Sequence, residues 1–184
     1  MSLRIGLASD THGNLDALAR AFEVFERADA EQVFFLGGRF ADVDAVLARR
    51  RRGAPDPIAA RIVRVASRAC PEGASEAART HVDLVAGRIC CLVHDKADLS
   101  RDDIANASVF FHGNSARAGI VQIGPRCFVT PGHLRAGAPA DAPPTFGMVD
   151  LADREVVLAV YSAVGAELRT ERCAPAAQGR VSVK

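Results

Sequence analysis

The feature of this sequence that most restricts its fold is a change of pattern near its middle. Up to residue 106, short apolar runs typical of buried strands alternate with helical patterns. After residue 108, short strand-like runs follow one another through turns that contain Gly or Pro. A βαβα half followed by a mostly antiparallel half predicts two sheets packed face to face. We therefore expect an α/β fold, a four-layer αββα sandwich of two mixed β-sheets flanked by helices.

The individual elements follow from the same periodicities. We predict helices over residues 15–27, 41–50, 75–86 and 102–106. We predict strands over residues 3–8, 32–36, 61–65, 88–93, 109–112, 120–123, 127–130, 145–150 and 155–162. Asn14 is expected to cap the first helix and Gly87 to close the third. Residues 1–165 are predicted to form a single domain, and residues 166–184 a terminal strand and a mobile tail.

Composition and charge exclude several function classes. The chain has 184 residues and a net charge of +1, so it is long enough for one domain and offers no excess charge to nucleic acid. We find no leader with a cleavage site and no apolar run of the roughly 18 residues that a membrane span needs. The basic run Arg49-Arg50-Arg51-Arg52 is typical of a solvated helix end, with a phosphate-binding patch as the alternative.

The cysteines indicate the redox environment. There are five, an odd number, and no C-x-x-C pair is present. Cys90 and Cys91 are adjacent in an apolar run, so they point to opposite faces of a strand. This usage favours buried thiols in a reduced, cytoplasmic chain over a disulfide framework.

The residues with the clearest chemical potential follow the first predicted strand. The apolar run of residues 3–8 leads into Asp10-Thr11-His12-Gly13-Asn14. A rigid strand that presents a carboxylate and an imidazole two residues apart offers one oxygen and one nitrogen donor to a metal ion. Further ligands would have to come from other strand ends.

The order of several local motifs resembles that of the calcineurin-like metallophosphoesterases, in particular their small single-domain phosphodiesterase branch. The resemblance spans residues 3 to about 163. Ser-Asp-Thr-His-Gly-Asn (9–14) matches the family's D-x-H-G-N, and Cys-Leu-Val-His-Asp (91–95) matches a strand that ends in a ligand His. Three further segments stand where the family has Gly-Asp, Gly-His-Thr-His and Asn-Pro-Gly-Ser: Phe-Phe-Leu-Gly-Gly (34–38), Phe-Phe-His-Gly-Asn-Ser-Ala (110–116) and Thr-Pro-Gly-His (130–133).

The resemblance implies two divalent metals that share a carboxylate and activate a bridging water. The carry-over to this chain is incomplete. Asp10 and His12 stand at ligand positions of the first metal, and His94 at one of the second. The other ligand positions hold different residues, namely Gly38 for the shared Asp, Ala69 of Ala69-Cys70-Pro71 for an Asn, and Asn114 and Ala116 for two His. Two dications about 4 Å apart repel by roughly 16 kcal/mol at an effective dielectric constant of about 20, so we expect no two-metal centre.

A single ion is the remaining metal hypothesis. Asp10, His12 and His94 would form a 2-His-1-carboxylate set, with Asn114 as a weak further ligand. We expect no cofactor, or at most one divalent ion (Zn, Mn or Fe). The alternative is local: Asp10 accepts backbone N–H groups and caps the first helix, and His12 is a turn residue.

The remaining candidates are contacts to phosphate or to the cleft. They are Asn14, Gly38, His112, Asn114 and His133, of which His133 stands where the family has Ser. Asp42 is a further carboxylate near Gly38, although its place in the first turn of a helix suits the helix dipole.

The incomplete ligand set leads to the functional prediction. We expect a catalytically inactive metallophosphoesterase-like protein, a pseudoenzyme that acts as a protein-binding or regulatory module, with no catalytic residue. Its partner would be another protein or a second copy, and neither a membrane nor nucleic acid is expected. The alternative is a divergent phosphodiesterase or phosphatase with one metal ion. A weaker third possibility is a non-hydrolytic phosphate sensor.

Overall fold

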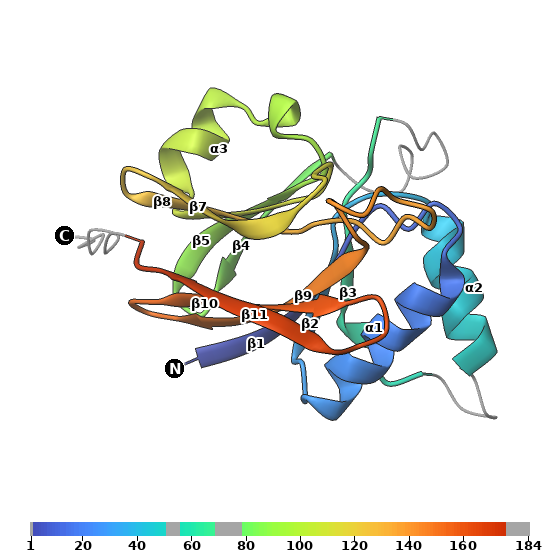
Figure 1. The fold of residues 1–184 in the computed structure, drawn as a ribbon. Coiled ribbons are helices and arrows are strands. Elements are labelled where there is room, and N and C mark those ends of the chain that lie inside the picture. The colour runs from blue at the N-terminus through green and yellow to red at the C-terminus, as the bar shows by residue number, and fades with distance from the viewer. Residues whose placement is uncertain (1, 51–55, 69–78, 176–184) are drawn as a thin grey trace.

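The computed structural model describes residues 2–50, 56–68 and 79–175, and these form two β-sheets packed face to face (Figure 1). Sheet A has the strand order β11-β10-β9-β1-β2-β3, and sheet B the order β4-β5-β6-β8-β7. Helices α1 and α2 lie against the outer face of sheet A, and α3 lies on the outer face of sheet B. The predicted four-layer αββα sandwich of two mixed sheets is confirmed.

Most element bounds lie within two residues of the prediction. The strands of sheet A are β1 (Ser2–Ala8), β2 (Gln32–Phe35), β3 (Ile62–Arg64), β9 (Thr145–Ala152), β10 (Val156–Ser162) and β11 (Glu167–Cys173). The strands of sheet B are β4 (Thr80–Val85), β5 (Arg88–Val93), β6 (Val109–His112), β7 (Ala118–Ile123) and β8 (Arg126–Pro131). The helices are α1 (Leu15–Arg27), α2 (Phe40–Arg50) and α3 (Arg101–Asn106), with short 3₁₀ helices at Ala59–Arg61 and Lys96–Asp98.

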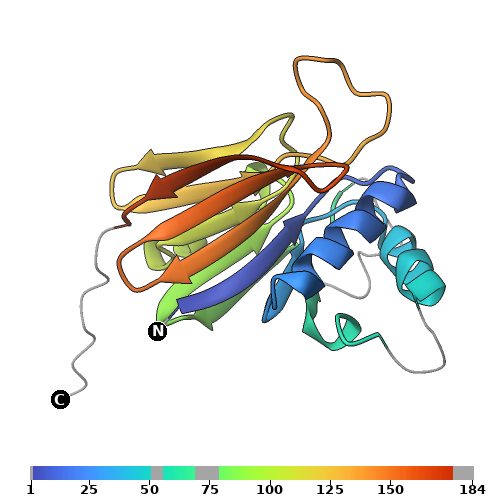
Figure 2. The ribbon, with the colours of Figure 1, turned by 60° about the horizontal axis from the view of Figure 1, so that its bottom comes forward.

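Parallel pairing decides where polar loops gather. In sheet A, β1 pairs parallel to β2 and β2 to β3. In sheet B, β5 pairs parallel to β6 and β6 to β8. The carboxyl ends of parallel neighbours meet at one edge of a sheet, and such edges are where α/β proteins place their sites. Figure 2 shows these loops at one end of the sandwich, on the side from which α1 begins.

The packing of α1 on sheet A illustrates how the core forms. Phe22 and Phe25 are fully buried, and the Phe25 ring lies edge-on to Phe146 of β9 at 5.5 Å. Burial of one such side chain contributes roughly 1.5–3 kcal/mol. A Cβ at Gly6 would lie 2.5 Å from the Phe25 ring, so the absence of a side chain there lets the helix approach β1.

The predicted helix over residues 75–86 is wrong for its described part. Residues 75–78 lie outside the described residues, and Thr80–Val85 forms β4, which pairs antiparallel with β5. Ala86 and Gly87 have φ of 49° and 79°, the positive values of a type I′ hairpin turn. Gly87 therefore closes a hairpin rather than a helix, and His81 lies on a strand.

The expectation that all cysteines are thiols is contradicted at one pair. Cys127 of β8 and Cys173 of β11 form a disulfide, with Cα atoms 6.7 Å apart, that joins the two sheets. Cys90 and Cys91 are buried free thiols as expected, and burial raises the pKa of each to about 12. Spacing along the chain could not reveal the pair, because β8 and β11 belong to different sheets and come together only in the folded protein.

Some predictions fall on segments that the structure does not describe. Ala69-Cys70-Pro71, the two arginines at 51 and 52, and the tail from residue 176 lie outside the described residues. Within the described ranges, we find no helix with the length and apolar character needed to cross a membrane.

Candidate functional site

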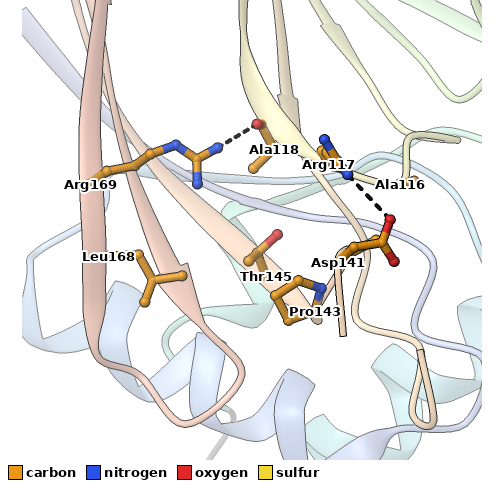
Figure 3. Close-up of a pocket in the computed structure, with 9 residues that line it drawn as sticks. Ala116, Arg117, Ala118, Asp141, Pro143, Thr145, Leu168 and Arg169 are labelled. Atoms are coloured by element: carbon orange, nitrogen blue, oxygen red, sulfur yellow. Dashed lines mark hydrogen bonds and ion pairs between the residues drawn. The ribbon is translucent and has the colours of Figure 1, made fainter. Parts of the chain in front are cut away.

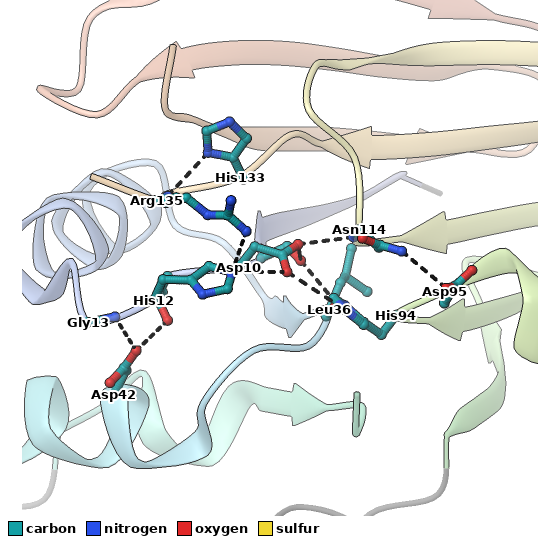
Figure 4. A network of polar contacts seen from close by, with 12 residues as sticks. Asp10, His12, Gly13, Leu36, Asp42, His94, Asp95, Asn114, His133 and Arg135 are labelled. Carbon is teal, nitrogen blue, oxygen red and sulfur yellow. Dashed lines mark hydrogen bonds and ion pairs between the residues drawn. The ribbon is translucent and has the colours of Figure 1, made fainter. Parts of the chain in front are cut away.

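The candidate site lies where four parallel strands end (Figure 4). Asp10 follows β1, Gly38 follows β2, His94 follows β5 and Asn114 follows β6. The first two belong to sheet A and the last two to sheet B, so the site bridges the two sheets. The structure thus brings together residues that are far apart in the sequence, as the motif order predicts.

Asp10 is the centre of the polar network. Its carboxylate is largely buried, and Oδ2 accepts hydrogen bonds from Ser9 Oγ at 2.6 Å and from the Asn114 backbone N–H at 3.0 Å. The residue has a φ of 52°, and its own N–H donates to Gly37 O at 3.0 Å. Asp10 therefore accepts a backbone N–H group, as the local role implies, but this N–H comes from Asn114 and Asp10 does not cap α1, whose N-cap is Asn14.

The second carboxylate oxygen faces two imidazoles. His94 Nε2 lies 3.6 Å and His12 Nε2 3.9 Å from Asp10 Oδ1. His94 Nδ1 donates to Leu36 O at 2.8 Å, because a carbonyl can only accept. This hydrogen bond turns Nε2 toward Asp10, the arrangement in which histidines bind metals.

His12 contacts an arginine that the sequence motifs did not single out. Arg135 Nη2 lies 3.0 Å from His12 Nε2. A guanidinium has only donors, so Nε2 must offer its lone pair to Arg135. The Arg135 backbone N–H in turn donates to His133 Nδ1 at 3.2 Å. In the sequence, Arg135 is marked only by its charge and by its position two residues after His133.

A buried carboxylate supports the loop that carries His12. Asp42 Oδ2 accepts hydrogen bonds from Thr11 Oγ1 at 2.6 Å and from the Gly13 N–H at 2.9 Å. His12, between these two residues, has a φ of 46°. Asp42 is thus used to position the loop, and it does not replace the carboxylate missing at Gly38.

Gly38 offers no side chain at the position where the resemblance implies a shared carboxylate. Its φ is 116°, a value that favours glycine. A Cβ there would lie 3.4 Å both from the Asp10 nitrogen and from the Phe35 ring. The backbone conformation therefore opposes a larger residue, whereas the distances alone correspond to ordinary van der Waals contact.

Two predicted contacts have structural roles. Asn14 caps α1, accepting from Ala17 N at 3.3 Å and donating to Leu134 O at 2.8 Å. His112 is buried, and its Nδ1 donates to Gly113 O at 2.9 Å. Burial holds the pKa of His112 below its ordinary value. Neither residue lines the cavity described next.

A cavity of about 330 Å³ opens beside Asp10. Its polar lining includes Asn114, His133 and Arg135. The Asn114 side chain donates to Asp95 Oδ2 at 3.1 Å. The pKa of Asp95 is lowered, first by the Ala97 N–H and, to a lesser degree, by this amide.

A second cavity of about 380 Å³ lies next to the first and shares Ala116 and Ala142 with it (Figure 3). Its arginines are bonded within the chain. Arg117 pairs with Asp141 at 3.3 Å, and Arg169 donates to Ala118 O at 2.7 Å. Because both guanidinium groups already contact groups of the chain, the second cavity offers an anionic ligand less positive charge than two arginines would indicate.

The donors do not fit the two-metal centre that the resemblance implies. Gly38 supplies no bridging carboxylate, and Asn114 and Ala116 stand where two imidazoles are needed. In the part of the chain that the structure describes, no group of three or more His, Cys, Asp or Glu side chains is placed to hold a metal ion. What remains is one carboxylate oxygen between two imidazoles, with an arginine bonded to one of them.

Comparison with known proteins gives a consistent result. The model of the calcineurin-like phosphoesterase superfamily domain matches residues 3–154. No curated protein sequence matches the chain. Among similar solved structures is YfcE, a phosphoesterase from E. coli, with 21% identity, 92% of this chain and 98% of that chain covered, and a TM-score of 0.63.

Two structures of Vps29 are similar to a comparable degree. Chaetomium thermophilum Vps29, complexed with a cyclic peptide, has 18% identity, 94% and 96% of the two chains covered, and a TM-score of 0.63. Entamoeba histolytica Vps29, complexed with Zn²⁺, has 17% identity, 94% and 99% covered, and a TM-score of 0.61. At these identities the solved structures establish a shared fold.

Proposed function

This chain belongs to the calcineurin-like phosphoesterase superfamily, and from that premise we propose that it is a catalytically inactive member that acts as a protein-binding or regulatory module. The observation that carries the proposal is Gly38. The position of the shared carboxylate holds a glycine with a φ of 116° and with Asp10 backbone atoms 3.4–3.5 Å from where a Cβ would stand. Without that carboxylate, two dications have no negative bridge to offset their repulsion.

The state of the surviving ligands supports the same proposal. Asp10 Oδ2 is bonded to Ser9 and to the Asn114 backbone, and His12 Nε2 is bonded to Arg135. Each of these contacts satisfies a polar group without a metal. The network thus holds the loops of the two sheets together, which is a structural role that a pseudoenzyme retains.

The outer face of sheet B supports the protein-binding part of the proposal. Strand register places one apolar side chain from each strand in a continuous row across the sheet: Val82, Cys91, Phe110, Phe128 and Val121. The centre of this apolar row is covered by the segment around Ala107 at the end of α3. Its two end residues remain 49% and 59% exposed, because α3 is too short to cover the whole face.

Neighbouring side chains extend this surface. Leu84 pairs with Ile89, and Ile123 with Arg126, on the same face as the apolar row. Among the described residues, seven large apolar side chains are exposed, and five of them lie on this face or on α3. The exposed apolar side chains lie at the two ends of this face, on β4 and β7, and exposed apolar surface of this kind is typical of a protein interface. We assign it to another protein or to a second copy of the chain, and the peptide bound to a Vps29 relative is consistent with this use of the fold.

The inactive state is tested by elemental mass spectrometry of the native protein beside Asp10→Ala, with a phosphodiester turnover assay on both. We expect no stoichiometric metal and no turnover in either. Metal-dependent turnover that Asp10→Ala abolishes would refute the proposal.

The interface is tested by changing one end of the apolar row. If this face holds a second copy, we expect Val121→Asp to abolish self-association, measured by analytical ultracentrifugation. Where the partner is another protein, the same substitution should abolish binding of that identified partner. Val164→Asp is the matched control, since Val164 is 79% exposed but lies beyond β10, away from sheet B. If both variants associate as strongly as the wild-type protein does, this face is not the interface and the proposal loses it.

The second candidate is a divergent phosphodiesterase or phosphatase with one divalent ion. The observation that favours it is the position of both imidazoles within 4 Å of Asp10 Oδ1. One equivalent of Zn, Mn or Fe that is lost in Asp10→Ala would support this candidate over the first. A cytoplasmic location also remains a prediction, and the Cys127–Cys173 disulfide opposes it because disulfides persist mainly in oxidising compartments.

A further inference from the structure

We propose that two copies of this chain pair edge to edge through β4, so that their two B sheets join into one continuous sheet. The inference rests on the proposed function in taking the chain to bind a protein, and it names a second copy as one such partner. It places that copy at the edge of sheet B and leaves the outer face of the sheet to another protein.

Three of the four edge strands in the described part of the chain are protected against such pairing. β3 has only three residues, and β11 carries charged side chains along its length. At β7, the Ile120 N–H donates to Glu171 Oε2 at 2.9 Å, and Ala118 O accepts from Arg169 at 2.7 Å. Short strands, edge charges and covered backbone groups are devices by which proteins prevent edge-to-edge association.

The fourth edge strand, β4, differs from these three. It is six residues long, and within the described ranges no strand lies on its free side. Its Val82 and Leu84 side chains are 49% and 68% exposed, and its only carboxylate is that of Asp83. A strand of this length with exposed apolar side chains at the edge of a sheet is a template for pairing with another chain.

The hairpin turn decides which backbone groups of β4 point to the free edge. The residues that flank a two-residue turn form a hydrogen-bonded pair, so the backbone of Val85 faces β5. Because this orientation alternates along a strand, the N–H and C=O groups of Thr80, Val82 and Leu84 face away from β5. The Leu84 N–H donates to the Asp83 side chain at 2.7 Å, as a group that faces away from β5 can.

Charge selects one antiparallel register for the pair. A two-fold axis at Val82 sets the two copies of Val82 opposite each other and pairs Thr80 with Leu84. It also sets His81 opposite Asp83 of the second copy. These two side chains share the other face of β4, where His81 Nε2 lies 4.0 Å from Asp83 Oδ2 of its own chain.

The alternative register is unfavourable. An axis at Asp83 would set two carboxylates directly opposite each other, which destabilises a strand pair. In the register centred on Val82, each imidazole meets a carboxylate, to which it can donate a hydrogen bond whether or not it is protonated. The segment from Thr80 to Leu84 is thus complementary to itself, and this favours a second copy over an unrelated strand.

The contact in this register is small. The Val82 pair and the two pairs of Thr80 with Leu84 form about six main-chain hydrogen bonds. On the outer face, the apolar row of one copy continues into that of the other through Val82. A small interface of this kind gives weak association, and we expect a dissociation constant in about the micromolar range.

The test is analytical ultracentrifugation at concentrations on both sides of this dissociation constant. We expect a monomer–dimer equilibrium in the wild-type protein. Val82→Asp sets two carboxylates opposite each other at the axis and should weaken dimerisation at least about ten-fold. Val121→Asp is the matched control, because it makes the same change at the other end of the apolar row, on β7. It should dimerise as the wild-type protein does.

A charge reversal tests the register. His81→Asp alone sets two carboxylates opposite each other and should also weaken dimerisation about ten-fold. Adding Asp83→Lys to His81→Asp restores opposite charges across the axis at Val82 and should recover the dimer. With the axis at Asp83, the double variant would instead set two lysines opposite each other.

Each outcome has a defined meaning. A monomeric wild-type protein overturns this inference, whereas the proposed function survives if another protein binds and Val121→Asp abolishes that binding. A dimer that Val82→Asp leaves intact, or that Val121→Asp also abolishes, overturns the inference because the contact is then not the β4 edge. Failure of the double variant to recover the dimer overturns it too, since the register carries the choice of a second copy. Circular dichroism and thermal unfolding of each variant establish that folded proteins are compared.

Discussion

The backbone N–H of Asn114 donates a hydrogen bond of 3.0 Å to Asp10 Oδ2, and this bond joins the end of β6 in one sheet to the end of β1 in the other. The acceptor is a carboxylate, so the bond is of the stronger, charge-assisted kind. Asp10, which the family resemblance places at a metal-ligand position, therefore has a structural role in joining the two sheets. This bond and three other features, at Gly38, His112 and the Cys127–Cys173 disulfide, lead to predictions for the free energy of unfolding.

Asp10→Ala should destabilise the protein. The substitution leaves the Ser9 hydroxyl and the Asn114 N–H without their acceptor, and we expect the free energy of unfolding to fall by roughly 2–4 kcal/mol. Urea denaturation measures it. Asp16→Ala is the control, because the Asp16 side chain is 98% exposed. A carboxylate kept only for metal binding would instead give a neutral or stabilising change.

Gly38→Ala should cost about 1–3 kcal/mol of unfolding free energy. The new Cβ meets the Asp10 nitrogen at 3.4 Å in a backbone conformation with φ of 116°. Gly137 also has a positive φ, but a Cβ there meets nothing within 4 Å. Gly137 has a φ of 66°, in the left-handed region that other residues can adopt, so Gly137→Ala should cost less than Gly38→Ala, and an equal cost would contradict this prediction.

Stability should fall in mildly acidic solution because of His112. Burial holds its pKa below the ordinary 6.5, so the unfolded chain binds a proton more readily than the folded protein. The contribution of the neutral ring is complete above about pH 6.5 and is lost as the pH falls through the folded pKa. We expect the urea midpoint to be lower at about pH 5.5 than at about pH 7.5. His112→Asn, which can still donate to Gly113 O, should reduce this difference; an unchanged difference would assign it to other groups.

Reduction of the Cys127–Cys173 disulfide should lower the free energy of unfolding by roughly 2–4 kcal/mol, because the bond closes a loop over a separation of 46 residues. Denaturation with and without reductant measures the effect, and Cys173→Ser should abolish its dependence on reductant. Thiol titration of the unfolded chain should find two more reactive groups after reduction. An identical count before and after would show that both cysteines are thiols, as the sequence alone indicated.

Local pattern was sufficient for most of the fold. The stripe of apolar residues in α1 and the apolar run of β1 are visible in the local sequence, and both were predicted with bounds close to those observed. The segment of β4 failed because its type I′ turn uses Ala86, a residue that favours helices and is rare at positive φ. Tertiary pairing with β5 outweighed that preference.

The strand-end residues of the site could be identified from the sequence, but the side chains that contact them could not. Asp10, His12 and His94 could be found because they lie at strand ends in a known order. Arg135 and Asp42 could not, since their roles depend on loops that meet from distant parts of the chain. A motif specifies which side chains could bind an ion, whereas the surrounding donors and acceptors determine whether they are free to do so.

The place of β1 in sheet A has a consequence for how this protein is made. β1 lies between β2 and β9, and Ser2 is paired with Ala152. During synthesis at about 5–20 residues per second, the first strand waits several seconds for its second neighbour to leave the ribosome. Throughout that time one edge of this strand, whose last four residues are buried in the folded protein, is open to other chains. Nascent protein should therefore depend on chaperones, and rapid translation between β2 and β9 should increase its yield.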